Sequence, residues 1–141
     1  MLKTIIKITS LLAALFIAIS CEESDSRYAN AIISKALSLM NDKLSQFDHI
    51  IVIPGSGCTG CISKAEQYFN ENVNNDNILF IFTNYYSFKN MTLRLGGLTN
   101  LNRNNVYCDA DNTFYLHEFN ERIYPYIISI DNTQFLTARP L

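Results

Sequence analysis

The sequence predicts an α/β fold in which a central mixed sheet is flanked by helices. Two short apolar runs, residues 49–54 and 77–84, are rich in the side chains typical of strands buried on both faces. Each run is followed by a stretch with helical spacing of apolar side chains. Residues 124–139 predict a closing hairpin. This order favours parallel strands covered by helices, with an active-site loop at the carboxyl end of a strand.

The composition fits one modest domain and argues against nucleic acid as a partner. The chain has 141 residues, of which 48% are hydrophobic. We divide it into a signal peptide (1–20), an acidic tether (21–25) and a folded domain (26–141). Without Lys3 and Lys7 of the signal peptide, nine basic residues face thirteen acidic ones, a net charge of −4. Phosphate binding needs a basic stripe, which this sequence lacks.

The first twenty residues have the pattern of an export signal. Lys3 and Lys7 stand at the start of an apolar run that is shorter than the roughly 20 residues of a transmembrane helix. The run stops at Cys21, and the boundary resembles the lipobox of bacterial lipoproteins, in which this cysteine is lipidated and becomes the N-terminus. Ala18 stands where leucine is most common. An ordinary cleaved signal peptide, with Cys21 as a stray thiol, is the alternative.

The residues after Cys21 bear on location. Glu22, Glu23 and Asp25 resemble the export tags of surface-exposed lipoproteins in the Bacteroidota. The resemblance implies a domain anchored by lipid to a bacterial membrane, with the outer membrane favoured, and facing the periplasm or the cell surface. Attachment would come from the lipid and not from charge.

Residues 26–45 predict an amphipathic helix in front of the first strand. We interpret it as an extra N-terminal helix that covers part of the sheet. A partner-binding or membrane-surface helix is the alternative, although its polar side is not rich in lysine. The apolar side chains at helical spacing are Ala29, Ile32, Ile33, Ala36, Leu37, Met40 and Leu44.

The remaining elements follow in order. Residues 59–73 predict a helix, and the turn-forming "NVNNDN" separates it from the strand at 77–84. "YSFKNMTLRLGG" predicts a third helix that its two glycines stop. Residues 104–110 predict a short strand and residues 112–119 a helical turn or two, before the hairpin at 124–139.

The stretch "IPGSGCTGC" places Cys58 at the start of a predicted helix and Cys61 almost one turn later on the same side. Backbone N–H groups at a helix start lack partners and carry partial positive charge, which favours a thiolate there. The thiolate is the nucleophile of disulfide exchange. The second sulfur is close enough to attack a mixed disulfide at the first. Gly55 and Gly57 allow a sharp turn, and Ser56 is a candidate helix cap.

A buried strand, "CTGC" opening a helix, and a later proline that begins a hairpin strand ("YPYIISID") resemble the thioredoxin-like proteins, especially the exported redoxins related to TlpA and ResA. The similarity covers residues 45–138. It implies that Cys58 is the nucleophile, that Cys61 resolves the mixed disulfide, and that Pro125 is a cis-proline beside them. Tyr124, which precedes this proline, would touch the substrate. No organic cofactor or metal is implied.

The sequence departs from this family at several positions. Gly57 stands where a tryptophan is usual, and Thr59-Gly60 replaces glycine-proline between the cysteines. Val52 lies where thioredoxin carries a buried acid. The acidic group that would relay a proton from Cys61 is therefore absent at this position. The chain reaches Leu141 directly after the hairpin, so we expect no C-terminal helix.

Other interpretations of the cysteine pair stay open. A C-x-x-C motif is half of a zinc site, and its plausible completions, Cys108 and His117, lack paired ligand spacing. A purely structural disulfide suits an exported protein, but closing so small a loop removes little chain entropy. We expect Cys108 to be a small core side chain rather than a third redox thiol. We expect His117 to be structural rather than a general base.

The sequence therefore predicts a membrane-anchored thiol-disulfide oxidoreductase. Its partners would be cysteine-containing exported proteins or a membrane electron donor that keeps the pair reduced. The alternative is a redox-inactive lipoprotein of the same fold that acts as a binding or scaffold module.

Overall fold

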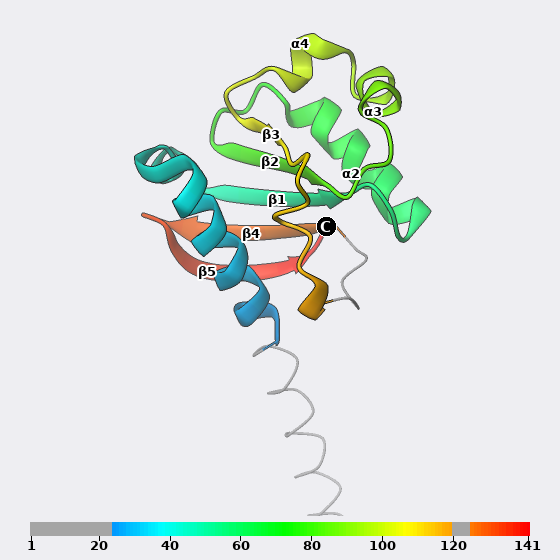
Figure 1. Ribbon diagram of the computed structural model, residues 1–141. Coiled ribbons are helices and arrows are strands. Elements are labelled where there is room, and N and C mark those ends of the chain that lie inside the picture. Colours follow the sequence, from blue (N-terminus) through cyan, green and yellow to red (C-terminus); the bar gives the residue numbers. More distant parts are fainter. Residues whose placement is uncertain (1–23, 120–124) are drawn as a thin grey trace, which may run out of the picture.

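The computed structural model describes residues 24–119 and 125–141 (Figure 1). Its centre is a five-stranded mixed sheet with the order β3-β2-β1-β4-β5. The first three strands in the chain are parallel to one another, and the last two form an antiparallel hairpin. The strands are β1 (His49–Pro54), β2 (Ile78–Thr83), β3 (Val106–Cys108), β4 (Tyr126–Asp131) and β5 (Gln134–Pro140). The predicted mixed α/β architecture is confirmed.

The helices also follow the predicted order, with differences at their ends. The N-terminal helix is α-helical over residues 24–40, and a 3-10 helix follows it from Asn41, which adopts a left-handed φ of 50°. The short helix α4 was not predicted, since four residues are too few to show a period. The helices after residue 40 are η1 (Asn41–Gln46), α2 (Thr59–Asn72), α3 (Phe88–Arg94), α4 (Leu98–Leu101) and η2 (His117–Phe119).

The end of α3 follows the predicted glycine signal. Ser87 caps its start, with the hydroxyl accepting a hydrogen bond from the Asn90 amide at 3.3 Å. The chain leaves the helix through Gly96 and Gly97, whose φ angles of 80° and 95° favour glycine. In the predicted helical segment 112–119, only the three residues of η2 are helical.

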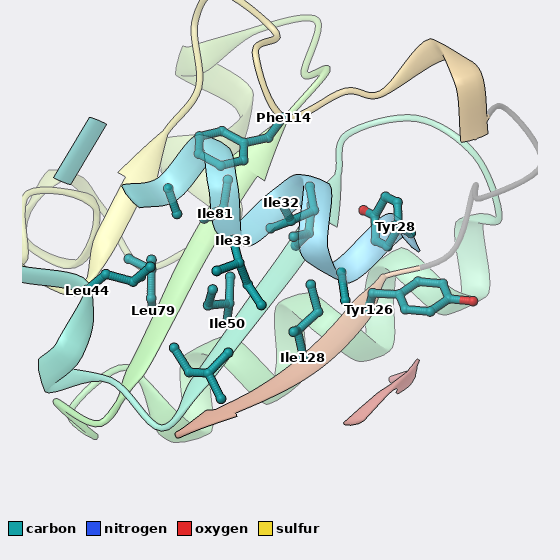
Figure 2. Close-up of a cluster of buried hydrophobic side chains, with 14 of the residues drawn as sticks. Tyr28, Ile32, Ile33, Leu44, Ile50, Leu79, Ile81, Phe114, Tyr126 and Ile128 are labelled. Carbon is teal, nitrogen blue, oxygen red and sulfur yellow. The ribbon is translucent and has the colours of Figure 1, made fainter. Parts of the chain in front are cut away.

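Alternating side chains of the strands give the sheet two cores, one on each face. Helix 24–40 lies across one face, and the segment around Phe114 and Leu116 completes this cover (Figure 2). Helices α2 and α3 cover the other face, where Phe69 of α2 packs edge-on against Phe80 at 5.0 Å between ring centroids. The residues that Figure 2 labels on the first face are Tyr28, Ile32, Ile33, Leu44, Ile50, Leu79, Ile81, Phe114, Tyr126 and Ile128.

Helix 24–40 is bound to the hairpin as well as to the centre of the sheet. The ring of Tyr28 lies 5.2 Å from that of Tyr126 and 5.4 Å from that of Phe119. The Tyr126 hydroxyl donates a hydrogen bond to the Asp25 carboxylate at 3.2 Å. The expectation that the N-terminal helix covers part of the sheet is therefore confirmed. Within the described ranges, no helix has the length and apolar character of a membrane span.

The α2 face is left open where β4 and β5 continue the sheet. Among the described residues only Leu141 follows β5, and no helix covers this region. Polar side chains lie on this part of the sheet: the His49 ring is within 3.1 Å of the Ser129 hydroxyl, and Thr137 is exposed opposite Ser129. Leu136 of β5 is exposed as well.

Candidate active site

The turn between β1 and α2 presents the cysteine pair at the carboxyl end of the sheet. Gly57 has a φ of 136°, a value that favours glycine. Cys58 is the N-cap residue of α2, and its carbonyl accepts the first helical hydrogen bond from the Ile62 amide at 3.0 Å. The predicted position of Cys58 at a helix start is confirmed. Ser56, the candidate cap, does not cap the helix. Its hydroxyl instead accepts a hydrogen bond from the side-chain amide of Asn84 at 2.6 Å.

Cys58 and Cys61 form a disulfide, with their Cα atoms 5.3 Å apart. Both residues are partly exposed, so the bond lies at the surface and not inside either core. Nowhere in the described ranges do three His, Cys, Asp or Glu side chains gather as metal ligands.

The start of α2 favours negative charge on the sulfur of Cys58, its N-cap residue. The first turn contains no acidic residue to neutralise the partial positive charge of the free N–H groups. No side chain caps the helix either, so these donors remain open to a charged group. On reduction, a Cys58 thiolate would lie against them and be stabilised as a nucleophile or leaving group.

Pro125 begins the hairpin beside the end of the strand that leads to the cysteines. Val52 pairs with Tyr126 in the β1–β4 register, so the preceding proline lies level with the last residues of β1 (Figure 1). Pro125 is buried, and its carbonyl accepts a hydrogen bond from the Leu141 amide at 2.9 Å. Tyr124 lies outside the described residues. The predicted cis peptide bond joins Tyr124 to Pro125, so it falls only partly within them.

Two other predicted positions fall wholly or partly outside the described residues. Cys21, the candidate lipidation site, lies outside the described residues. His117 opens η2, but its side chain is not among those described. Val52 is 2% exposed and faces helix 24–40, on the opposite side of the sheet from α2.

Cys108 is a free thiol at the end of β3. It is half-buried and packs against the core beneath α2 and α3, as predicted for a small core side chain. Burial raises the pKa of this thiol above its ordinary value. Its thiolate fraction at neutral pH is therefore lower than that of an open cysteine, which disfavours a nucleophilic role.

Asn84 is a site residue that the sequence analysis missed. It follows β2 directly, with a left-handed φ of 52°, and its side-chain amide is the donor to Ser56. Its backbone amide donates to the side-chain oxygen of Asn112 at 2.9 Å. Polar residues that directly follow buried parallel strands meet at one edge of the sheet, and this signal could have found it.

Asp109, also missed, fixes the loop that delivers Asn112. Its carboxylate is fully buried and accepts hydrogen bonds from the Thr83 hydroxyl at 2.7 Å and from two backbone amides. These amides belong to Thr113, at 2.9 Å, and Phe114, at 2.8 Å. A buried carboxylate with three donors is the arrangement expected when such a group stabilises a loop.

The space between α2 and α3 beside the turn is almost filled. Glu66 of α2 and Arg94 of α3 form an ion pair at 2.9 Å. A pocket of about 10 Å³ is lined by this pair together with Gly55 and Tyr85, and it has room for about one water molecule.

No family model matches this sequence, and no curated protein or solved structure matches it either.

Proposed function

We propose that this protein is a thiol-disulfide oxidoreductase with a thioredoxin-like architecture, and that it exchanges disulfides with exported proteins. One observation carries the proposal: Cys58 of a partly exposed Cys58–Cys61 disulfide is the N-cap residue of α2. A helix start stabilises the thiolate that such exchange requires, and partial exposure admits another protein's thiol.

Three further features support the thioredoxin-like part of the proposal. The buried strand β1, which pairs with β2 in parallel register, leads directly into the cysteine turn. Pro125 begins a hairpin strand that pairs with β1 in antiparallel register. The start of this strand lies at the same edge of the sheet as the beginning of α2 (Figure 1). In thioredoxin-like proteins a proline in this position packs beside the redox cysteines.

The proposed reaction transfers two electrons in two exchange steps. A thiolate of the partner attacks the sulfur of Cys58, the bond to Cys61 breaks, and Cys61 leaves as a thiolate that takes a proton from water. A second partner thiolate then attacks the partner sulfur of the mixed disulfide and releases Cys58 as a thiolate. The partner gains a disulfide and the protein gains two thiols. The reverse sequence reduces a partner disulfide, with Cys58 as nucleophile and Cys61 as resolving thiol.

The proposal includes export and lipid anchoring at Cys21, which rest on the sequence pattern. Helix 24–40 is fixed on the sheet, so few residues would separate the anchored cysteine from the folded domain. At about 3.5 Å per extended residue, this tether keeps the disulfide close to the bilayer. Partners would be exported cysteine-containing proteins or a membrane electron donor that reach the bilayer surface.

Equilibration with glutathione tests the redox activity. We expect the purified protein to pass reversibly between disulfide and dithiol forms in graded glutathione buffers, as measured by alkylation and a mass shift. In cells, Cys61→Ser should accumulate mixed disulfides at Cys58, because the resolving thiol is gone. Cys108→Ser is the matched control and should accumulate none.

Failure of the pair to cycle would contradict the proposal. A disulfide that resists glutathione buffers, together with no adducts of Cys61→Ser, would favour the binding or scaffold module. Loss of a fatty-acid label in Cys21→Ala tests the anchor separately.

A further inference from the structure

The turn that carries Cys58 is attached to the neighbouring strand by side-chain and backbone contacts. Besides the 2.6 Å bond between Asn84 and Ser56, the Gly55 amide donates to the Thr83 carbonyl at 2.8 Å. Gly55 also approaches the next loop closely, because a Cβ atom on it would lie 2.5 Å from the Tyr85 Cα atom. The start of the turn is therefore fixed against the end of β2.

Asn84 is itself held in place from the other side. Its backbone amide donates a hydrogen bond to the side-chain oxygen of Asn112, which lies in the loop that the buried Asp109 carboxylate organises. Asn84 and Asn112 both have left-handed backbones, with φ angles of 52° and 56°. A continuous set of hydrogen bonds therefore runs from the buried end of β3 to the hydroxyl two residues before Cys58.

We infer that Asn84 is a positioning residue of the redox site, which acts through Ser56 to stabilise the disulfide form of the cysteine pair. The inference rests on the proposed function. Gly57 separates Ser56 from Cys58, and a glycine supplies little local stiffness at this link. The position of the turn relative to α2 therefore depends on the bond from Asn84 at one end and on the disulfide at the other.

This arrangement stabilises the two redox forms unequally. The disulfide restrains Cys58 against α2 and so keeps the turn in the conformation that Asn84 bonds. Reduction releases Cys58, the turn gains freedom, and the bond to Ser56 is formed for a smaller share of the time. Removing the bond should therefore destabilise the disulfide more than the dithiol and make the pair easier to reduce.

Asn84→Gly tests the inference, because glycine accepts the left-handed backbone and removes only the side chain. A neutral hydrogen bond contributes about 0.5–1.5 kcal/mol, and only the part that the dithiol form loses shifts the equilibrium. We therefore expect the disulfide–dithiol equilibrium against glutathione to shift by up to about tenfold toward the dithiol, which corresponds to a reduction potential up to about 30 mV more positive. Asn132→Gly is the matched control: it has a φ of 46° and bonds Asp131 in the β4–β5 turn. It should leave the potential unchanged.

Ser56→Ala gives a second, independent variant, since it removes the acceptor and leaves Asn84 in place. It should shift the equilibrium in the same direction, and the double variant should shift it no further than Asn84→Gly alone. Urea unfolding of each form checks that the variants fold.

An unchanged potential in both single variants, with lower stability in urea, would overturn the inference and leave Asn84 a structural residue. Additive shifts in the double variant would also overturn it, because the two residues would then act separately. If the unmodified protein fails to equilibrate with glutathione at all, the proposed function fails instead.

Discussion

The two faces of the sheet differ in how completely they are covered. The core beneath helix 24–40 includes side chains from all five strands, from Tyr107 on β3 to Phe135 on β5. Among the strand residues, the core beneath α2 and α3 stops at Ile127 of β4, and Ser129 and Thr137 lie beyond it. The first face is thus covered across the whole sheet, whereas the second divides its area between a core and open sheet.

This difference bears on where reactive chemistry can lie. Helix α2 buries one side through Ile62, Ala65 and Phe69, and its first turn carries the partly exposed disulfide. Helix 24–40 contacts the sheet along its length and presents no cysteine among the described residues. We therefore expect core substitutions on either face to lower the free energy of unfolding by similar amounts. Only those beneath α2 should also shift the disulfide–dithiol equilibrium of the cysteine pair.

The largest effect should come from the core beneath α2. Phe69 is fully buried and packs edge-on against Phe80 and Phe82, at 5.0 and 5.1 Å between centroids. We expect Phe69→Ala to lower the free energy of unfolding by about 3–5 kcal/mol, because it leaves a cavity. It should also shift the glutathione equilibrium of the disulfide, since α2 loses its main anchor. Urea unfolding and alkylation measure the two effects.

Ile32→Ala on the opposite face is the matched comparison. Ile32 is also fully buried, and its truncation should cost about 2–5 kcal/mol. Because helix 24–40 lies across the sheet from α2, the glutathione equilibrium should stay as in the unmodified protein. An equal redox shift in both variants would show that the faces are not independent.

A smaller effect is expected where helix 24–40 meets the hairpin. Tyr126→Phe removes the 3.2 Å hydrogen bond to Asp25 and keeps the ring that packs on Tyr28. We expect a loss of about 0.5–1.5 kcal/mol in the free energy of unfolding, measured in urea. Asp25→Asn should cost less, since an amide oxygen can still accept. A loss comparable to that of Ile32→Ala would mean that the hydroxyl does more than bond Asp25.

The smallest effect should come from the uncovered part of the α2 face. Thr137 is exposed on β5, opposite Ser129. Thr137→Ala should change the free energy of unfolding by no more than about 0.5 kcal/mol in urea, as is usual for surface positions. A loss of several kcal/mol would indicate that a partner or another segment covers this face in solution.

The successes of the sequence analysis concern short-range features. The strands at 49–54 and 78–83, the helix after Cys58 and its position at the helix start all follow from patterns within a dozen residues. The failures concern contacts between distant segments. Ser56 is a candidate helix cap because serine is a preferred residue just before a helix, but its hydroxyl accepts a hydrogen bond from Asn84, 28 residues away. No pattern in the residues near Ser56 predicts this hydrogen bond.

The sequence by itself determined most of the elements, their order and the spacing of the two cysteines. These properties depend on backbone hydrogen bonds and side-chain period within single segments, which the local residues specify. Only the tertiary structure decided that Asp109 is buried with three donors, and that Asn84 bridges the turn before Cys58 to the loop after β3. Such pairs form because parallel strands bring their carboxyl ends to one edge of the sheet. The order of the strands in the sheet therefore decides which residues meet, and nearby residues in the sequence do not.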